Sequence, residues 1–231
     1  MTAPFFVSSH STCVAELTPC LAAIIPALNE EHSIEAVIRQ ISHRALAIVV
    51  DDGSSDNTAM LARAAGAYVV SHTENRGYDC ALETGLLTAI ALGCTFAVTM
   101  DADGQHDPTL LDQFSAELSA GADLVVGRRD RTQRWSEALF CIVGCVAWGL
   151  NDPLCGMKGY RLSILDGMKG INTYPSIGTE LAVRLVKGGV KAHQLLLKTK
   201  PREGISRFGD GFKANMAIIR ALWFGLVAHY P

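Results

Sequence analysis

Apolar positions follow two alternating patterns between residues 21 and 127. Short apolar runs bounded by turn residues predict buried strands, which we expect at residues 21–26, 47–50, 67–70, 96–100 and 124–127. The stretches between them are helical in period: Ile34, Val37, Ile38 and Ile41 follow the i, i+3, i+4, i+7 spacing of one buried face. Strands alternating with helices of this length predict βαβ units, and therefore a Rossmann-like α/β fold with a mostly parallel sheet flanked by helices.

Turn and capping residues mark where these helices begin and end. Asn29 is expected to cap the first helix, and the second is expected to end near Gly66. The third is expected over residues 79–92, while Pro108 and Gly121 suit the first turn and the end of the fourth.

The pattern changes after Gly127. The features that follow are a basic stretch at 128–134, an apolar segment at 135–150, a helix at 179–187, a strand at 190–200, a basic loop at 201–211 and a helix at 212–228. The longest uncharged apolar run, 138–150, is about thirteen residues, fewer than the roughly 20 that a membrane-spanning helix needs. No repeat or linker divides the chain, so we expect one domain over residues 21–231 after a lead-in of residues 1–20.

Composition narrows the class of protein. The chain has 231 residues, of which 49% are hydrophobic and 19% charged, and these values argue against disorder. Lys and Arg number 20 against 23 Asp and Glu, so there is no broad positive field for nucleic acid. The seven cysteines include no C-x-x-C pair, and the N-terminus has no basic region before an apolar core. We therefore expect a reducing, cytoplasmic location.

Acidic turns follow three strands of the expected sheet. They are residues 29–31, Asp51-Asp52 and Asp101-Ala102-Asp103. In an open α/β sheet, ligands gather outside the carboxyl ends of the strands, which is where these turns fall. Aspartates at D-x-D spacing can direct both carboxylates at one hard cation, Mg²⁺ or Mn²⁺, which keeps open positions for phosphate oxygens. Gln105 could add an oxygen ligand, although D-x-D alone is a weak signal that also fits a turn capping the helix that opens at Pro108.

Taken together, these turns resemble the family 2 glycosyltransferases with the GT-A fold. The segments that carry the resemblance, in the family's order and spacing, are IIPALNE (24–30), VVDDGSSD (49–56), NRG (75–77), TMDADGQHDP (99–108) and VGRR (126–129). DPLCGMKGYR (152–161) and REGISRFG (202–209) further resemble the branch that contains dolichyl-phosphate mannose and glucose synthases. The resemblance spans residues 21–210 and implies a single GT-A domain in which residues 128–231 form the acceptor side.

The resemblance also implies roles for individual residues. Those that would cradle the nucleotide base and ribose are Pro26, Ala27, Leu28, Glu30, Val50 and Asp52. Those that would hold the ribose, the metal and the diphosphate are Asp101, Ala102 and Asp103, with Gln105 beside the metal. Arg129 would lie close to the sugar-diphosphate, and Arg202 and Arg207 would close over the phosphates.

The chain departs from the family at three places. Leu28 stands where an aromatic residue is frequent, and Arg207 stands where lysine is usual. Tyr78-Asp79 replaces the glycine-rich G-x-G that often follows N-x-G. The histidines, His72 and His106 among them, suggest no chemistry by their positions.

The reaction that the resemblance implies is transfer of a sugar from a nucleoside-diphosphate sugar, with inversion at the anomeric carbon. The cation at Asp103, with Arg202 and Arg207, would stabilise the departing diphosphate. A hydroxyl acceptor needs a general base as well, whereas a phosphate acceptor is already ionised near pH 7. Residues 130–200 contain no acidic ED pair, and the lone candidates for a base are Asp152 and Glu180. Each has a plain structural alternative, as a turn aspartate and as a first-turn helix charge.

The second half of the chain also bears on the acceptor. Lys158 and the arginines of 128–134 could attract an anionic acceptor or lipid head groups. The segments 135–150 and 212–228 are too apolar for ordinary surface helices. This leaves burial in the core, a homodimer interface, or peripheral contact with the cytoplasmic face of a membrane, with Trp135, Trp148 and Trp223 at head-group depth.

A polyprenyl phosphate is therefore the acceptor we expect, with a GDP- or UDP-sugar as donor. The alternatives are a saccharide hydroxyl of a cell-envelope polysaccharide or glycolipid, and a catalytically idle nucleotide-sugar binding module. A nucleotidyltransferase is disfavoured because the loop after the first strand, PALNEE, is acidic and lacks glycine. A dinucleotide-dependent oxidoreductase is disfavoured because no G-x-G-x-x-G follows that strand.

Overall fold

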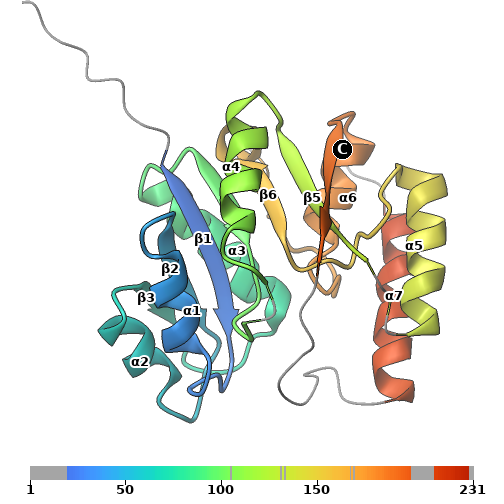
Figure 1. Cartoon of the computed structure of the whole chain (residues 1–231). Coiled ribbons are helices and arrows are strands. Elements are labelled where there is room, and N and C mark those ends of the chain that lie inside the picture. The colour runs from blue at the N-terminus through green and yellow to red at the C-terminus, as the bar shows by residue number, and fades with distance from the viewer. Residues whose placement is uncertain are drawn as a thin grey trace, which may run out of the picture.

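Within the described residues, seven strands form one sheet with helices on both faces (Figure 1). The computed structural model describes residues 20–228 except residues 105, 131, 133, 167, 169 and 199–210. The strands are β1 (Leu21–Ala27), β2 (Leu46–Asp51), β3 (Tyr68–Ser71), β4 (Phe96–Thr99), β5 (Leu124–Arg129), β6 (Lys158–Arg161) and β7 (Ala192–Leu197). The helices are α1 (Ile34–Ile41), α2 (Thr58–Ala64), α3 (Tyr78–Ala91), α4 (Leu110–Ser119), α5 (Trp135–Trp148), α6 (Glu180–Lys187) and α7 (Phe212–Val227), with a 3-10 turn at Leu162–Leu165.

The sheet is mostly parallel, as the strand and helix alternation predicts. Its order is β3-β2-β1-β4-β6-β5-β7, and every adjacent pair is parallel except the two that involve β6. All residues of β1 are buried, because this strand lies inside the sheet and both of its faces are covered. Burial on both faces explains why the strand is a continuous apolar run rather than an alternating one.

Alternate residues of β1 enter two separate cores. Ala23 and Ile25 pack with α1, α2 and α4 on one face, whereas Ala22 and Ile24 pack on the face that carries α3, α5, α6 and α7. Gly85 brings α3 close to this second face, since an added Cβ would overlap the side chain of Ile24. The two cores fix the carboxyl edge of the sheet, where β1, β2 and β4 end.

The antiparallel strand β6 was not expected from the sequence. It pairs with β4 and β5, with Lys158 opposite both Thr99 and Val126. Four residues with a charge at each end carry no strand periodicity, so only the pairing with distant strands identifies them. The insertion of β6 places Gly156 beside the end of β4, where the Thr99 hydroxyl donates to the Gly156 carbonyl at 2.7 Å.

The first helix begins later than predicted. It starts at Ile34 with Ser33 as its N-cap, so the prediction that Asn29 caps it is wrong. Asn29 instead has a positive φ of 54°, a turn conformation that asparagine tolerates well. The other predicted boundaries agree with the structure to within about three residues.

Helices α5 and α7 lie side by side at the end of the sheet away from β3 (Figure 1). Trp148 is only 7% exposed and packs against Phe140, so the prediction that it lies at head-group depth is wrong. Trp135 and Trp223, by contrast, are both exposed. None of the helices in the described part of the chain is long and apolar enough to cross a membrane.

Candidate active site

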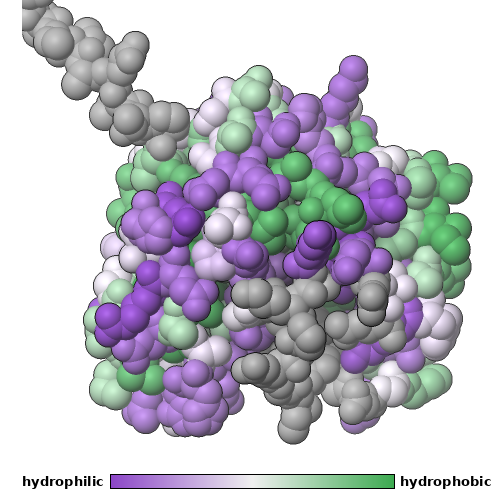
Figure 2. Space-filling model, viewed as in Figure 1, coloured by the Kyte–Doolittle hydropathy of each residue, from purple (hydrophilic) through white to green (hydrophobic). Residues whose placement is uncertain are grey.

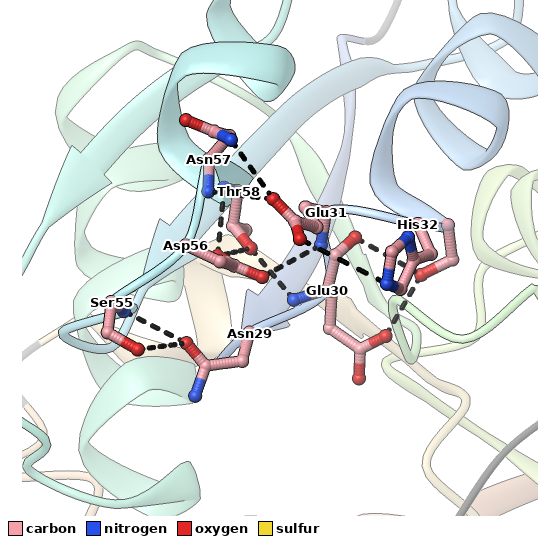
Figure 3. Close-up of polar contacts among 9 residues, drawn as sticks. Asn29, Glu30, Glu31, His32, Ser55, Asp56, Asn57 and Thr58 are labelled. Atoms are coloured by element: carbon pink, nitrogen blue, oxygen red, sulfur yellow. Dashed lines mark hydrogen bonds and ion pairs between the residues drawn. The ribbon is translucent and has the colours of Figure 1, made fainter.

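Two loops meet at the carboxyl ends of β1 and β2 (Figure 3). The Asn29 side-chain oxygen accepts the backbone N–H of Ser55 at 2.9 Å, and the backbone N–H of Glu30 donates to Thr58 Oγ1 at 2.7 Å. Asp56 accepts hydrogen bonds from Thr58 and from the backbone of Glu31. Burial by itself would raise the pKa of Asp56, but these hydrogen bonds lower it. These hydrogen bonds therefore join the PALNEE loop to the DDGSSDNT loop.

The predicted nucleotide-binding residues on these loops differ in how they are exposed. Pro26, Ala27 and Val50 are buried within the sheet, so only their backbone could face a nucleotide. The backbone carbonyl of Ala27 already accepts the N–H of Asp52 at 2.8 Å. Leu28 and Glu30 are partly exposed at the rim.

Asp52 organises the turn at residues 75–77. Its carboxylate accepts the backbone N–H groups of Arg76 at 2.9 Å and Gly77 at 2.8 Å, and His72 Nδ1 at 2.7 Å. The other ring nitrogen of His72 lies 3.0 Å from Thr84 Oγ1. His72 was missed from the sequence because no local pattern indicates a partner twenty residues away. In this structure Asp52 holds a turn in place, and its direct contact with a nucleotide stays a prediction.

The D-x-D turn follows β4. The Tyr78 hydroxyl donates to Asp101 Oδ1 at 3.2 Å, and His106 Nε2 lies 3.5 Å from Asp101 Oδ2. Gly156 packs against the same carboxylate, since an added Cβ would lie 2.6 Å from Oδ2. Ala102 is buried, and Asp103 is partly exposed beside it.

The donor set at this turn suits a hard divalent cation. Two carboxylates two residues apart in one turn, Asp101 and Asp103, fit Mg²⁺ or Mn²⁺, which favour oxygen ligands and leave positions for substrate phosphates. Among the described residues, no three His, Cys, Asp or Glu side chains gather into a preformed metal cluster. Gln105, the third predicted ligand, lies outside the described residues, as do Arg202 and Arg207.

Arg129 pairs with two carboxylates. Its Nε and Nη2 donate to the two carboxylate oxygens of Asp152 at 2.8 and 3.0 Å, and Glu137 lies 3.5 Å from Nη2. The backbone N–H of Arg129 also donates to Asp152. Burial would lower the pKa of Arg129, but the hydrogen bonds and charge of Asp152 raise it overall, so the guanidinium stays charged. Arg129 and Asp152 therefore act as one unit in this structure.

Lys158 does not face solvent. It is 2% exposed, and its Nζ donates to the backbone carbonyl of Cys155 at 2.5 Å. Burial lowers its pKa. The prediction that Lys158 attracts lipid head groups is therefore wrong, because β6 carries this side chain into the interior.

Glu180, the other candidate base, lies in the first turn of α6. It is 1% exposed. Its carboxylate accepts the backbone N–H groups of Thr173 at 2.8 Å and Tyr174 at 3.2 Å, and also the Thr173 hydroxyl. In this structure Glu180 holds the chain that precedes the helix.

The fold defines the class of protein. A solved structure of glucosyl-3-phosphoglycerate synthase from Mycobacterium tuberculosis, in complex with Mn²⁺, UDP-glucose and phosphoglyceric acid, has a similar fold, with a TM-score of 0.73. The match covers 90% of this chain and 79% of that chain at 22% sequence identity. The mostly parallel sheet with acidic turns at its carboxyl edge is thus the GT-A fold of glycosyltransferases.

Sequence comparison gives the family. Residues 22–135 match the family described as glycosyl transferase family 2. An uncharacterised glycosyltransferase of Mycobacterium tuberculosis is 30% identical over 213 residues, which cover 88% of this chain and 96% of that protein. Polyprenol monophosphomannose synthase of Mycolicibacterium smegmatis is 25% identical over 229 residues, which cover 88% of this chain and 86% of that protein. The chain belongs to glycosyl transferase family 2 and is a glycosyltransferase, as its motifs predict.

Proposed function

We propose that the protein transfers a sugar, with inversion, from a nucleoside-diphosphate sugar to a polyprenyl-phosphate-type acceptor at a membrane surface. The donor is bound at the carboxyl edge of β1, β2 and β4, where the loops after these strands converge. Residues after β5 form the acceptor side. The similarity to a polyprenol monophosphomannose synthase over most of both chains supports this choice of acceptor.

The observation that best supports a phosphate acceptor is that both candidate bases, Asp152 and Glu180, are already engaged in other contacts. A general base must reach the acceptor hydroxyl and take its proton. Asp152 binds Arg129 through both oxygens, and Glu180 is buried and hydrogen-bonded to Thr173. Carboxylates whose oxygens already accept such hydrogen bonds are poorly placed to take a proton from an acceptor. A phosphate acceptor needs no deprotonation, so it suits this site better than a hydroxyl acceptor.

A divalent cation completes the donor side of the proposal. Asp101 and Asp103, with Gln105, would hold Mg²⁺ or Mn²⁺, which when bound supplies positive charge to a departing diphosphate. Arg202 and Arg207 would add charge from the other side of the phosphates. Tyr78 and His106 hold the Asp101 carboxylate toward the edge of the sheet, so part of the ligand set is oriented before the donor arrives.

Exposed apolar side chains on α5 and α7 support a lipid acceptor. Val146 is 85% exposed, and hydrophobic residues gather on the edge formed by α5 in Figure 2. The other exposed apolar residues of the two helices are Trp135, Leu139, Ile142, Phe212, Met216, Trp223, Leu226 and Val227. An apolar surface beside the acceptor half would hold the enzyme where a lipid phosphate is presented.

A donor and acceptor screen tests the proposal. The purified protein is incubated with UDP- and GDP-sugars, Mg²⁺ or Mn²⁺, and detergent-dispersed polyprenyl phosphate, and release of nucleoside diphosphate is measured. We expect metal-dependent release that requires the lipid phosphate. Asp103→Asn should lower the rate by about 100-fold or more, because it removes a carboxylate ligand of the cation whose charge stabilises the leaving diphosphate. Asp112→Asn, which removes an exposed carboxylate of α4 paired with Arg44, is the matched control.

Two results would contradict the proposal. Release that is indifferent to the lipid, or that appears only with a saccharide, would make a hydroxyl the acceptor and return Asp152 and Glu180 as candidate bases. Tight nucleotide binding without turnover of any donor would indicate a binding module.

A further inference from the structure

Three carboxylates hold residues 171–178 through backbone N–H groups. Glu83 of α3 accepts the N–H of Ile171 at 2.9 Å, and Glu180 of α6 accepts those of Thr173 and Tyr174. Asp79, one helical turn before Glu83, accepts the N–H groups of residues 176–178. We call residues 171–178 the tethered loop. It belongs to the second half of the chain, yet two of its three anchors lie on α3 in the first half.

Asp79 makes the densest of these contacts. Its carboxylate accepts the N–H groups of Ser176 at 2.9 Å, Ile177 at 3.0 Å and Gly178 at 2.6 Å, and the Ser176 hydroxyl at 2.7 Å. Ile177 has φ of 51° and Gly178 has φ of 79°. A β-branched residue is unfavourable in this left-handed region. The charge-assisted hydrogen bonds that the loop donates to Asp79 therefore stabilise this unfavourable conformation.

Tyr78 touches both the tethered loop and the D-x-D turn. Its hydroxyl donates to Asp101 Oδ1 at 3.2 Å. Its ring lies beneath Gly178, where an added Cβ would be 2.8 Å from Cε1. The neighbouring Gly77 donates its N–H to Asp52 at 2.8 Å. Residues 77–79, at the start of α3, thus contact Asp52, the D-x-D turn and the tethered loop.

We propose that Tyr78 and Asp79 are positioning residues that couple the occupancy of the donor site to the order of the tethered loop. The inference rests on the proposed function, because it takes Asp101 as part of the donor site. A donor and cation that fix the Asp101 carboxylate also fix the Tyr78 hydroxyl, and the ring then restrains Gly178. Asp79 keeps the loop within reach of that ring. The loop in turn lies on the acceptor half, so donor binding prepares the acceptor side.

Coupling of this kind is reciprocal. The factor by which the bound nucleotide favours the ordered loop equals the factor by which the ordered loop strengthens nucleotide binding. The proposal therefore makes two linked predictions, one on the exchange of loop amides and one on the affinity for nucleotide.

Hydrogen–deuterium exchange and calorimetry on the full chain test the coupling, with Mn²⁺ and UDP or GDP as probes. In the unsubstituted protein, Mn²⁺ with nucleotide should slow exchange of the amides of residues 176–178. Tyr78→Phe keeps the ring and the four bonds to Asp79. It should leave exchange of the nucleotide-free loop unchanged, abolish the protection by nucleotide, and weaken nucleotide binding by about fivefold.

Asp79→Asn tests the anchor. An amide presents N–H groups where one carboxylate oxygen accepted two hydrogen bonds, so the loop amides should exchange faster without nucleotide, and nucleotide binding should weaken by about fivefold. Tyr68→Phe, on exposed β3, and Asp112→Asn, in the first turn of α4, are matched controls that should change neither measurement. Thermal melts check that each variant is folded. If Asp79→Asn does not fold, Tyr78→Phe by itself tests the coupling.

The outcomes separate the inference from the proposed function. If the unsubstituted protein binds neither nucleotide with Mn²⁺, the proposed function is wrong and the coupling fails with it. If it binds nucleotide but loop exchange does not respond, or if Tyr78→Phe keeps both the protection and the affinity, the coupling alone is overturned.

Discussion

The position of each side chain at the candidate active site depends on the residues that pack against it. Asp101 shows this most clearly, since Tyr78 and His106 flank its two oxygens and Gly156 packs against the carboxylate. Gly156 belongs to the segment that resembles the polyprenyl-phosphate branch, and the structure supplies a physical reason for a glycine there. Any side chain at position 156 would occupy the space of the Asp101 carboxylate.

Gly156→Ala should therefore impair cation and nucleotide binding without unfolding the protein. The added Cβ would lie 2.6 Å from Asp101 Oδ2, so the carboxylate must rotate away from its place. We expect nucleotide affinity with Mn²⁺ to fall by about tenfold, corresponding to about 1.4 kcal/mol, measured by titration calorimetry. Gly188→Ala, at the end of α6, is the control and should bind normally. Unchanged affinity in Gly156→Ala would remove Asp101 from the donor site.

The buried ion pair of Asp152 and Arg129 gives a second prediction at this scale. Asp152→Asn should lower the free energy of unfolding by about 3 kcal/mol, because it leaves the Arg129 guanidinium without its bidentate partner. Chemical denaturation measures this loss. Asp123→Asn, which breaks the more exposed pair with Arg161, should cost less than about 1 kcal/mol. A large loss of turnover in Asp152→Asn with unchanged stability would instead indicate a general base.

Helices and strands place individual residues, and three of them, β6, α5 and α7, do so in ways that local sequence does not reveal. β6 runs antiparallel between β4 and β5, which turns Lys158 inward and brings Gly156 against the D-x-D turn. Helices α5 and α7 pack together, bury Trp148, and leave their outer apolar residues exposed. Apolar residues of these two helices are thus either buried in the core or exposed on the surface, and only the packing decides which.

The exposed face of α5 is expected to bind membranes. Ile142→Asp combined with Val146→Asp places charge where apolar side chains would enter the lipid interface, so co-sedimentation with phospholipid vesicles should fall strongly. Affinity for Mn²⁺ and nucleotide should not change, because α5 lies away from the ends of β1, β2 and β4. Met60→Asp, an exposed position of α2, is the control. Loss of dimers rather than of vesicle binding would make this face a homodimer interface.

At the scale of the molecule, one sheet joins the two halves of the chain. The first half contributes β1 to β4, and β5 to β7 extend the same sheet through the antiparallel β6. Cores on both faces hold the sheet together, and each core contains residues from both halves of the chain. Ligands bound at the carboxyl edge should therefore stabilise the whole protein in a single cooperative transition.

Mn²⁺ and nucleotide added together should raise the melting temperature. A ligand at about 100 times its Kd stabilises the folded state by about 2.7 kcal/mol, which is about 5–10 °C for a domain of this size. Differential scanning fluorimetry with UDP and with GDP would identify the nucleotide as well. EDTA should abolish the shift, and Asp103→Asn should reduce it. A shift of the same size with nucleotide and EDTA would show that binding does not need the cation.

The amino-acid sequence by itself determined the strands and helices of the parallel half, the α/β class and the family. These follow from periodicity and short motifs, which are local in the chain. It did not determine β6, the start of α1, or the burial of Trp148 and Lys158. Nor did it determine the partners of Asp52, Asp152 and Asp79, which lie 20 to 99 residues away. Only the tertiary structure decided these, because a buried carboxylate takes whichever donors the packing of distant elements brings to it.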